Sequence, residues 1–555
     1  MPSKLPRTLL ILLAVIFVLN LVQAFFMELI FDEAYYWHYS QNMAFGYFDH
    51  PPMVAWLIGL GSLLFDGNLG IRFLSCLLSV GTILILWNTI DNNKKSDFVV
   101  HFVVLAFSMT LLNFYGFLTL PDTPLLFFCA LFLLVYKNFI SKPSWVLAIT
   151  LGLAMAALMY SKYHAILVIF FVLLSNLKLL TNKFAWLAVI TALFAYTPHF
   201  LWLYENNAIS IQYHLFERPN NAYDFNKYTL GFLLNLVVLF GLTFPWVYRA
   251  LFRTKMNNTF IKSLLFLTYG VLLFFFISSF NRRVQTQWII IICIPLITVV
   301  FNNMMVDKTS RKWVFRMGLA NIAILLFLRL GLVFEEISPI HYESHGNKDW
   351  VQQVKDKAKS NPVVFENSYR LAPMYAYYSC ETSFSLNNVF YRQNQYSIDA
   401  SETEVQHKNV YYVSKSPSGG EVAFINDKGT EFYGRFIKGF ESFRKLRVEV
   451  DGTVFKLDHK KELVFQLTNP YKTDIPFNKL KFAVVYLNEY KRKPDVNQIM
   501  VKPIGTNIST LKSNDTLRFT FRLPQPKLKD PRYFRIAISE NDLHYGLNGK
   551  PIKLE

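Results

Sequence analysis

Long apolar runs separated by short polar loops dominate the first three-fifths of the chain. A membrane-spanning helix needs about 20 consecutive, mostly apolar residues, and about eleven runs of this kind are present. The pattern predicts a multi-span α-helical membrane region. The runs cover residues 8–30, 70–91, 98–118, 122–141, 145–160, 164–181, 184–204, 228–250, 260–280, 286–303 and 312–334.

Two apolar segments need separate interpretation. The first run follows Lys4 and Arg7, as a signal peptide would, but it is too long and lacks a small-residue cleavage site. We therefore expect an uncleaved first helix. The segment 53–65 is too short to cross a bilayer, so we expect an interfacial or re-entrant helix there.

The pattern changes near Ile340. Helical patterns at 349–360 and 370–378 flank a short buried-strand pattern at 362–365. Short β-rich segments separated by turn residues then suggest an antiparallel sandwich. We predict a transmembrane domain at 1–335, an α/β domain at 336–435 and a β-rich domain at 436–555. The β-rich segments are 446–450, 463–467, 482–487, 516–521 and 533–538.

The basic residues of the loops predict the orientation. With the N-terminus in the cytoplasm, fifteen Lys and Arg fall in inside segments and five fall in outside loops. This bias agrees with the positive-inside rule. An odd number of spans then places the C-terminal region outside the cytoplasm.

Composition supports the membrane assignment and narrows the partners. The chain is 53% hydrophobic and 17% charged, whereas soluble proteins are about a quarter charged. The net charge of +18 does not indicate nucleic acid, because the basic residues of the first part lie in short membrane loops and those of the second part can face anionic lipids. We expect membrane lipids as partners and no nucleic acid. The four cysteines offer no disulfide framework and no zinc spacing.

The loop after the first apolar run carries the candidate chemistry. Ionisable side chains at a membrane edge are costly unless they have partners or a task. These acids either form a water-facing helix end, or act as a general base or a cation ligand. Two separate acidic positions in one aromatic loop, which Pro51-Pro52 ends rigidly, favour the functional interpretation. The candidate catalytic acids are Asp32, Glu33 and Asp49; His50 follows them, and Tyr35, Tyr36 and Tyr47 are candidate substrate contacts.

Other polar groups fall on the same predicted face. Asp122 is either a helix cap or a substrate contact. Lys162 is either solvated or a point charge for a lipid phosphate. Arg282 and Arg283 either reach toward the headgroups or offer the fork that phosphate prefers. Tyr163 and Gln285 are further candidate substrate contacts.

These parts suggest a mechanism. A lipid-linked sugar phosphate would place its phosphate against Lys162 and Arg283, with Arg282 and His50 nearby, and these cations would stabilise the leaving phosphate. A carboxylate near Asp32 would activate the attacking hydroxyl from the opposite side, which inverts the anomeric configuration. The sequence shows no Walker A motif and no Gly-rich turn after a strand, which fits an energy source carried by the lipid. No ligand spacing requires a metal, so no metal ligands are assigned, and a divalent cation is left open as a cofactor.

Several motifs support a family resemblance. Asp32-Glu33-Ala34-Tyr35-Tyr36-Trp37 and Gly46-Tyr47-Phe48-Asp49-His50-Pro51-Pro52 resemble the first outer loop of bacterial membrane glycosyltransferases. These enzymes are related to the protein O-mannosyltransferases and to the aminoarabinose transferase that modifies lipid A. The resemblance covers about residues 8–400, and further matches lie at 120–125, 161–163, 283–288, 362–369 and 391–396.

The resemblance implies a GT-C fold with an extracytoplasmic α/β and β-sandwich-like region. It also implies a polyprenyl-phosphate sugar donor and an extracytoplasmic glycolipid, glycan or protein acceptor. Asp32 would be the leading catalytic residue, supported by Glu33 and Asp49, while Lys162 and Arg283 would contact the donor phosphate. The implied location is the bacterial inner membrane, with the C-terminal region in the periplasm.

Two other functional classes fit the pattern less well. A transporter or flippase for a polyprenyl-linked sugar should show repeated halves and midplane ionisable groups. The sequence shows no repeat, and its candidate groups fall at one interface. A membrane-anchored binding or sensor protein would need only one or two spans.

Overall fold

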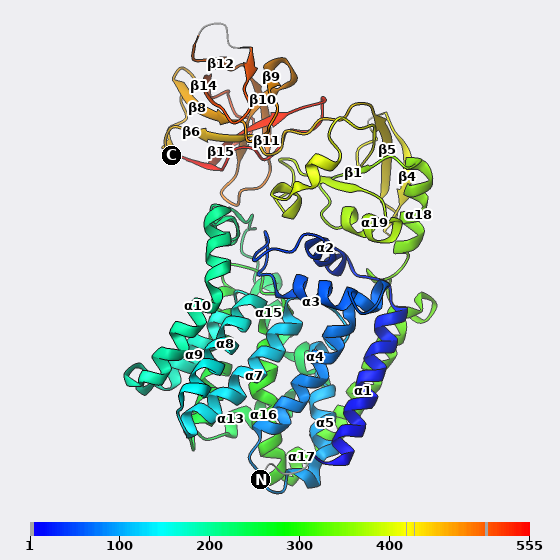
Figure 1. Ribbon diagram of the computed structural model, residues 1–555, viewed down its shortest axis with the longest axis vertical. Coiled ribbons are helices and arrows are strands. Elements are labelled where there is room, and N and C mark those ends of the chain that lie inside the picture. Colours follow the sequence, from blue (N-terminus) through cyan, green and yellow to red (C-terminus); the bar gives the residue numbers. More distant parts are fainter. Residues whose placement is uncertain (1–4, 418, 427, 506–508) are drawn as a thin grey trace. The chain divides into compact units, whose positions relative to one another are not determined.

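The computed structural model describes residues 5–417, 419–426, 428–505 and 509–555. Its internal contacts divide the chain into two units (Figure 1). Unit 1 comprises Met1–Asn207 and Tyr223–His345. Unit 2 comprises Ala208–Ala222 and Gly346–Glu555. Each unit is described by itself.

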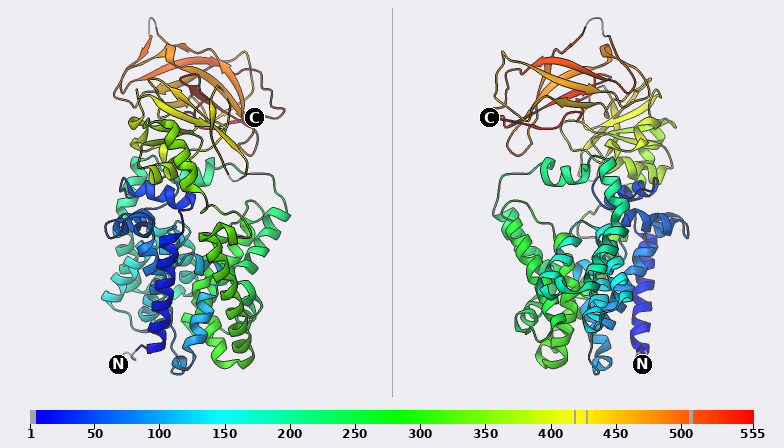
Figure 2. Two further views of the ribbon diagram at one scale, coloured as in Figure 1. Left: turned by 90° about the vertical axis from the view of Figure 1, so that its right-hand side faces the viewer. Right: turned by 60° about the vertical axis from the view of Figure 1, so that its left-hand side comes forward.

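Unit 1 is helical, and in the described residues eight of its helical stretches are long and apolar enough to cross a membrane. Helix α4 packs against α1, α7 and α16, and Figure 2 shows the blue, cyan and green helices of unit 1 running side by side. The prediction of a multi-span α-helical protein is therefore confirmed. The eight stretches are α1 (Arg7–Phe26), α4 (Gly67–Thr89), α7 (Asp122–Ser141), α10 (Lys183–Glu205), α14 (Thr259–Ser278), α17 (Lys308–Val333), Asn226–Arg253 with α12 (Gly231–Phe240) and α13 (Phe244–Arg253), and Thr286–Val306 with α15 (Thr286–Ile289) and α16 (Cys293–Val306).

The count of about eleven spans is not confirmed. Three of the predicted crossings occur as shorter helices: α5 (Val99–Phe107) with α6 (Thr110–Phe114), α8 (Trp145–Ser161) and α9 (Ala165–Ser175). A helix rises about 1.5 Å per residue, so the 11 residues of α9 fall well short of a hydrocarbon core about 30 Å thick. The segment expected at the interface forms α3 (Met53–Ser62), which has 10 residues.

A buried arginine ties three helical segments of unit 1 together. Arg329 on α17 is 1% exposed. Its guanidinium donates to Asn20 Oδ1 at 3.0 Å and to Asn113 Oδ1 at 3.3 Å, and it lies over the Phe117 ring. The Arg329 carbonyl accepts from Gln23 Nε2 at 3.0 Å. A charge inside a membrane region needs such partners, and here they bind α17 to α1 and α6.

The first part of unit 2 is a mixed sheet with two helices, α18 (Asn347–Ala358) and α19 (Leu371–Ser379). The strand order is β2-β1-β3-β5-β4. Strand β1 is parallel to β2 and β3, whereas β5 is antiparallel to β3 and β4. The strands are β1 (Val363–Glu366), β2 (Ser383–Leu386), β3 (Val410–Ser414), β4 (Glu421–Ile425) and β5 (Glu431–Ile437).

The second part of unit 2 is built from two larger sheets. Their orders are β11-β10-β15-β16-β7 and β12-β14-β8-β6, and the pairings are antiparallel except for β16 with β7. Alternate residues of β8, such as Leu463, Phe465 and Leu467, are buried, and Phe465 faces Phe519 across the ladder. The strands are β6 (Arg447–Val450), β7 (Val454–Phe455), β8 (Glu462–Thr468), β10 (Lys481–Leu487), β11 (Asp495–Ile499), β12 (Lys502–Pro503), β14 (Thr516–Arg522), β15 (Tyr533–Ser539) and β16 (Ile552–Leu554), with β9 (Ile475–Pro476) and β13 (Thr510–Leu511) as a separate pair.

The segment 208–222, which follows α10 in the chain, packs within unit 2. The Asn220 N–H donates to the Tyr490 carbonyl at 3.2 Å, and Arg492 Nε donates to the Asn220 carbonyl at 2.7 Å. Arg392 donates to the Tyr213 hydroxyl at 3.2 Å and lies over its ring. A loop predicted between two spans is therefore part of the other unit.

A buried carboxylate joins the two parts of unit 2. Glu402 is 1% exposed, and its carboxylate accepts from Ser442 Oγ at 2.6 Å, from Tyr471 Oη at 2.7 Å and from the Arg444 N–H at 3.0 Å. Despite these bonds, burial raises the pKa of Glu402 above its ordinary value, because desolvation penalises the charged form.

The raised pKa of Glu402 predicts a pH-dependent stability. Because the folded pKa lies above the unfolded value of about 4.3, the stabilising contribution is complete below that value and is lost as the pH rises through the folded pKa. We expect the melting temperature of the protein in detergent to decrease as the pH rises above about 4.3. Glu402→Gln should flatten this profile, whereas Glu449→Gln, at an exposed carboxylate, should leave it unchanged. Identical profiles for wild type and Glu402→Gln would contradict the expectation.

Candidate active site

Two adjacent acids begin helix α2 (Phe31–Ser40), and the second of them is fully neutralised. Glu33 is 0% exposed, and its two oxygens accept from Arg72 Nε at 2.8 Å and Arg72 Nη2 at 2.5 Å. The same carboxylate accepts from the Thr119 N–H at 2.9 Å and from the Ile30 N–H at 3.3 Å. This pair closes the N-terminus of α2 and fixes its first turn against α4.

Arg72 also binds the end of α1. Its Nη1 donates to the Ala24 and Met27 carbonyls at 3.1 and 2.6 Å, and its Nη2 donates to the Glu28 carbonyl at 2.9 Å. These carbonyls lie at the helix C-terminus, where a cation is favoured by the helix dipole. Arg72 therefore joins α1, α2 and α4 at one corner.

The first acid, Asp32, is only partly buried and belongs to a second cluster. Its carboxylate lies near enough to Tyr115 to interact with it electrostatically, and the Asp122 carboxylate also lies beside Tyr115. Asp122 Oδ1 in turn lies 2.6 Å from Lys162 Nζ, and both side chains are almost fully buried. Asp32, Tyr115, Asp122 and Lys162 therefore form one polar group within unit 1, which we call the acid–lysine cluster.

The third acid of the loop lies in an aromatic cluster. Asp49 Oδ2 accepts from the Tyr35 hydroxyl at 3.1 Å. Tyr39 stacks on Tyr47 with ring centroids 4.3 Å apart and meets Tyr35 edge to face at 4.7 Å. Burial raises the pKa of Tyr47 to about 12. Tyr36 contacts this cluster and the His50 ring, so the aromatic residues hold the loop in shape around Asp49.

Helix α10 holds the same loop through a histidine. His199 Nδ1 lies 2.6 Å from the Phe45 carbonyl, and His199 Nε2 lies 3.2 Å from the Tyr163 hydroxyl. Because a carbonyl can only accept, Nδ1 carries the proton and Nε2 accepts from Tyr163. Trp56 Nε1 also donates to the Ala44 carbonyl at 3.1 Å. The loop is thus fixed to α10 and α3, beside the end of α8.

The two predicted arginines lie on the turn between α14 and α15. Arg283 and Gln285 are exposed, and Arg282 is half-buried. The turn is anchored on α12, because Asn235 Nδ2 donates to the Val284 carbonyl at 3.0 Å. Among the described residues, the structure records no hydrogen bond or ion pair that joins Arg283 to Lys162 or Asp122.

The predicted site residues are therefore distributed over several places, with Glu33 paired to Arg72 and Tyr163 bound to His199. Asp32, Asp122 and Lys162 meet in the acid–lysine cluster. The sequence pattern does not single out Tyr115, which lies near both acids, because the apolar run 98–118 predicts one long span there. Its signal was the group Asn113-Phe114-Tyr115, where polar side chains interrupt the apolar run. The aromatic loop holds Asp49, His50, Tyr35, Tyr36 and Tyr47, while Arg282, Arg283 and Gln285 lie on the α14–α15 turn.

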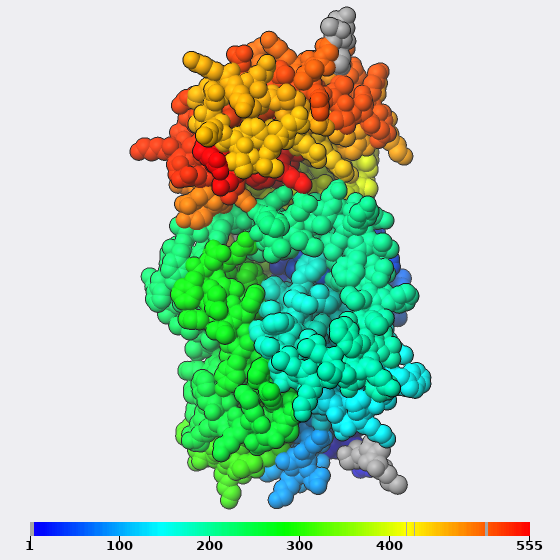
Figure 3. Space-filling model, turned by 90° about the vertical axis from the view of Figure 1, so that its left-hand side faces the viewer, coloured from blue at the N-terminus to red at the C-terminus, as the bar shows by residue number. Residues whose placement is uncertain are grey.

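The flank of unit 1 is hollowed. Figure 3 shows a depression between the green and the cyan segments, with blue atoms of the N-terminal part visible at its bottom. The exposed side chains of these spans are large and apolar, as Phe170 on α9 and Phe274 on α14 illustrate.

Sequence comparison relates part of this region to known enzymes. Residues 49–202 match the family described as dolichyl-phosphate-mannose-protein mannosyltransferase. A stretch of 142 residues is 32% identical to lipid A galacturonosyltransferase RgtD from Rhizobium johnstonii. This alignment covers 25% of the chain and 30% of that relative, so the chain matches less than a third of its length.

Structural comparison covers more of the chain. ArnT from Cupriavidus metallidurans in the apo state matches with a TM-score of 0.57 at 13% identity, over 77% of this chain and 97% of ArnT. The chain has the GT-C fold. ArnT bound to undecaprenyl phosphate matches with a TM-score of 0.55 at 12% identity, over the same shares of both chains. At these identities the likeness establishes the GT-C fold alone, and it confirms the fold class expected from the sequence.

The Glu33–Arg72 pair predicts a strong effect on stability. Arg72→Met would leave the Glu33 carboxylate buried without its cation, which typically costs about 3–5 kcal/mol. We expect a marked fall in the melting temperature of the protein in detergent. The double variant Glu33→Gln/Arg72→Met should recover part of the loss, because no buried charge remains. A single variant as stable as wild type would show that the corner does not depend on this pair.

Proposed function

We propose that the chain is an integral-membrane glycosyltransferase that moves a sugar from a polyprenyl-phosphate-linked donor to an extracytoplasmic acceptor. The observation that carries the proposal is the acid–lysine cluster, which places a partly accessible acid and a buried lysine in one polar group. The GT-C fold and the match of residues 49–202 to a dolichyl-phosphate-mannose-dependent family support the donor class.

Asp32 is the proposed general base. Glu33 is engaged on both oxygens by Arg72 and the backbone, so a second role in proton transfer would require breaking a buried ion pair. Asp32 instead lies half-buried on the first turn of α2, within the electrostatic range of Tyr115. A positioned carboxylate of this kind contributes roughly 10²–10⁴-fold to proton transfer.

Lys162 is the proposed contact for the donor phosphate. Its ammonium is already paired with Asp122 at 2.6 Å, so a donor phosphate would share or replace this partner. Arg283, Arg282 and His50 are further candidates for the same phosphate. Arg283, on the exposed α14–α15 turn, could provide the bidentate contact that a lysine cannot.

The proposed reaction is an in-line displacement. The acceptor hydroxyl attacks the anomeric carbon while its proton passes to the Asp32 carboxylate. The bond between that carbon and the phosphate oxygen breaks, and the polyprenyl phosphate leaves with the bonding electron pair, stabilised by the cations. Attack from the side opposite the phosphate inverts the anomeric configuration.

The remaining assignments are proposals of the same kind. The acceptor class is a glycolipid, a glycan or a protein. We place the chain in a bacterial inner membrane with unit 2 in the periplasm, which the loop charges support. Asp49, Tyr35, Tyr36, Tyr47, Asp122, Tyr163 and Gln285 are the proposed substrate contacts or their supports.

The role of Asp32 is tested with labelled polyprenyl-phosphate sugars. Purified full-length protein is mixed with a panel of undecaprenyl-phosphate hexoses and pentoses and with envelope lipids, glycans or proteins as acceptors. We expect Asp32→Asn to lower kcat by about 10²–10⁴-fold with little change in the affinity for undecaprenyl phosphate.

Asp66→Asn is the matched control, because Asp66 is an exposed carboxylate at the start of α4. It should keep wild-type turnover. Equal turnover of wild type and Asp32→Asn would remove Asp32 from the catalytic role. No transfer from any donor of the panel by wild type would argue against the donor class itself.

The role of Lys162 is tested by binding of undecaprenyl phosphate, which needs no acceptor. Because a charge-assisted hydrogen bond contributes about 1.5–3 kcal/mol, Lys162→Met should raise the Kd roughly 10- to 100-fold. The double variant Lys162→Met/Asp122→Asn separates binding from folding, because it removes the charge left unpaired on Asp122. Lys137→Met, at another Lys–Asp pair, is the control and should bind as wild type does. Loss of stability without loss of affinity in the double variant would give Lys162 a structural role only.

A further inference from the structure

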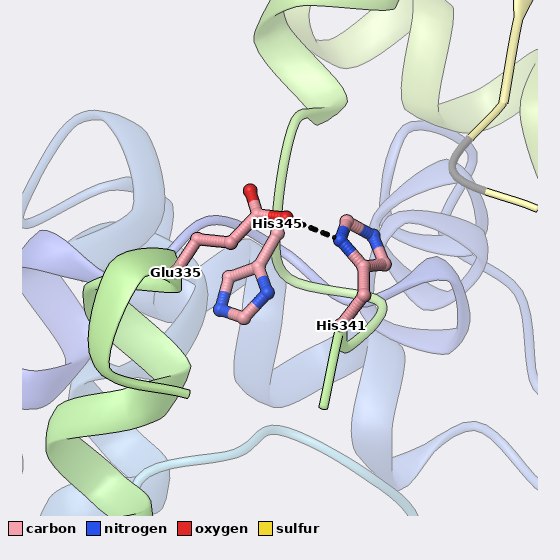
Figure 4. A group of neighbouring side chains, drawn as sticks. All are labelled: Glu335, His341 and His345. Carbon is pink, nitrogen blue, oxygen red and sulfur yellow. Dashed lines mark hydrogen bonds and ion pairs between the residues drawn. The ribbon is translucent and has the colours of Figure 1, made fainter. Parts of the chain in front are cut away.

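Three potential metal ligands gather where the last long helix of unit 1 ends. Beyond α17 a short turn carries Glu335, and the chain then bends back so that His341 and His345 face it (Figure 4). One ligand atom from each of the three residues lies within 4.8 Å of the others. Glu335 Oε1 and His341 Nδ1 are already 2.7 Å apart.

His345 is held in the manner of a metal-binding histidine. It is 5% exposed, and its Nε2 lies 2.8 Å from the Gly331 carbonyl. Because the carbonyl accepts, Nε2 carries the proton, and the lone pair of the neutral ring is on Nδ1. Histidines that bind metals usually donate their other ring N–H to a carbonyl or carboxylate, which fixes the ring. Ser344 Oγ donates to the Leu332 carbonyl at 2.9 Å and holds the same turn.

The Nδ1 of His345 has a weak partner that a metal ion can replace. It accepts from the Tyr342 N–H at 3.1 Å. Glu335 and His341 have side chains that are 56% and 30% exposed, so they can rotate and leave a path from solvent. Ligand atoms around a tetrahedral zinc lie about 3.4 Å apart, so closing the group requires shifts of about 1 Å, mostly in these exposed side chains.

We propose that Glu335, His341 and His345 bind one Zn²⁺ ion. Two imidazole nitrogens and one carboxylate are a ligand set that Zn²⁺ accepts, with water in the fourth position. Ca²⁺ and Mg²⁺ prefer oxygen ligands and fit this set poorly. The sequence signal is a histidine pair four residues apart with a glutamate six residues before it. The site is separate from the acidic loop at residues 32–49, where the sequence neither requires nor excludes a divalent cation.

The ion would fix a turn that lies beside the acid–lysine cluster. Tyr342 lies between the two histidines in the chain, and its side chain lies near Tyr115 of that cluster. Zinc would therefore order the turn that carries Tyr342. Zinc binding at this site does not depend on the proposed function. Only an effect of zinc on sugar transfer would rest on that function.

The test measures zinc directly in the full-length protein without a histidine tag. After EDTA treatment, reloading with Zn²⁺ and dialysis against metal-free buffer, we expect one Zn²⁺ per chain by elemental analysis, with its affinity determined by competition with a chromophoric chelator. His341→Ala and Glu335→Gln should each weaken zinc binding at least roughly 100-fold, since even the loss of an outer-shell partner costs about 10–100-fold. Both residues are exposed, so these variants should fold. Zinc should also slow hydrogen exchange of the 336–345 peptide in wild type but not in His341→Ala.

A matched control distinguishes the site from an adventitious histidine pair. His407→Ala removes an exposed histidine that lies 3.4 Å from Glu441, and it should keep full zinc binding. Ca²⁺ or Mg²⁺ at millimolar concentration should not displace the zinc. Equal zinc content in wild type and His341→Ala, or a loss of zinc in His407→Ala alone, would overturn the proposal. The sugar-transfer assay is not needed for any of these outcomes, so they are independent of the proposed function.

Discussion

The buried ion pair between Glu33 and Arg72 is the interaction on which the corner formed by α1, α2 and α4 depends. Every polar atom of the pair that the structure describes faces either its partner or a backbone group of α1, α2 or the segment before α7. Removing two charges from water costs desolvation free energy, and only such complete hydrogen bonding offsets that cost. The corner is therefore formed as a whole, because a partial arrangement would leave a bare charge in an apolar environment.

This pair also explains how two neighbouring carboxylates can differ so strongly in their burial and in their partners. Glu33 is paired with the Arg72 guanidinium, whereas Asp32, one residue earlier, lies near Tyr115, which in turn lies beside the Asp122–Lys162 pair. Because both acids lie on the first turn of α2, anchoring Glu33 also fixes the position of the Asp32 backbone. The lysine of the cluster is paired with the Asp122 carboxylate, which lowers the cost of burying a cation in the helical unit.

Much of the architecture could be predicted from the sequence, because apolar runs and strand periodicity report burial directly. Strands β8, β10, β14 and β15 lie within one residue of the predicted segments at each end. The first outer loop was recognised from its acids and aromatic residues. The partners of those acids could not be predicted. Arg72 lies in an apolar run 39 residues from Glu33 in the chain. Tyr115 lies near Asp32 and Asp122 only in the folded protein, because these residues come from other segments. Hydrophobic periodicity likewise could not separate a crossing from two short helices, as at α5 and α6.

The placement of residues 208–222 has a mechanical consequence. Because this segment leaves unit 1 after Asn207 and returns at Tyr223, the polypeptide passes between the two units at three peptide bonds, the third after His345. A soluble head attached by one tether can swivel freely and is shed by a single cut. Here a nick at the 345/346 bond would leave residues 346–555 held by their non-covalent contacts with segment 208–222, which stays covalently joined to unit 1 at both of its ends.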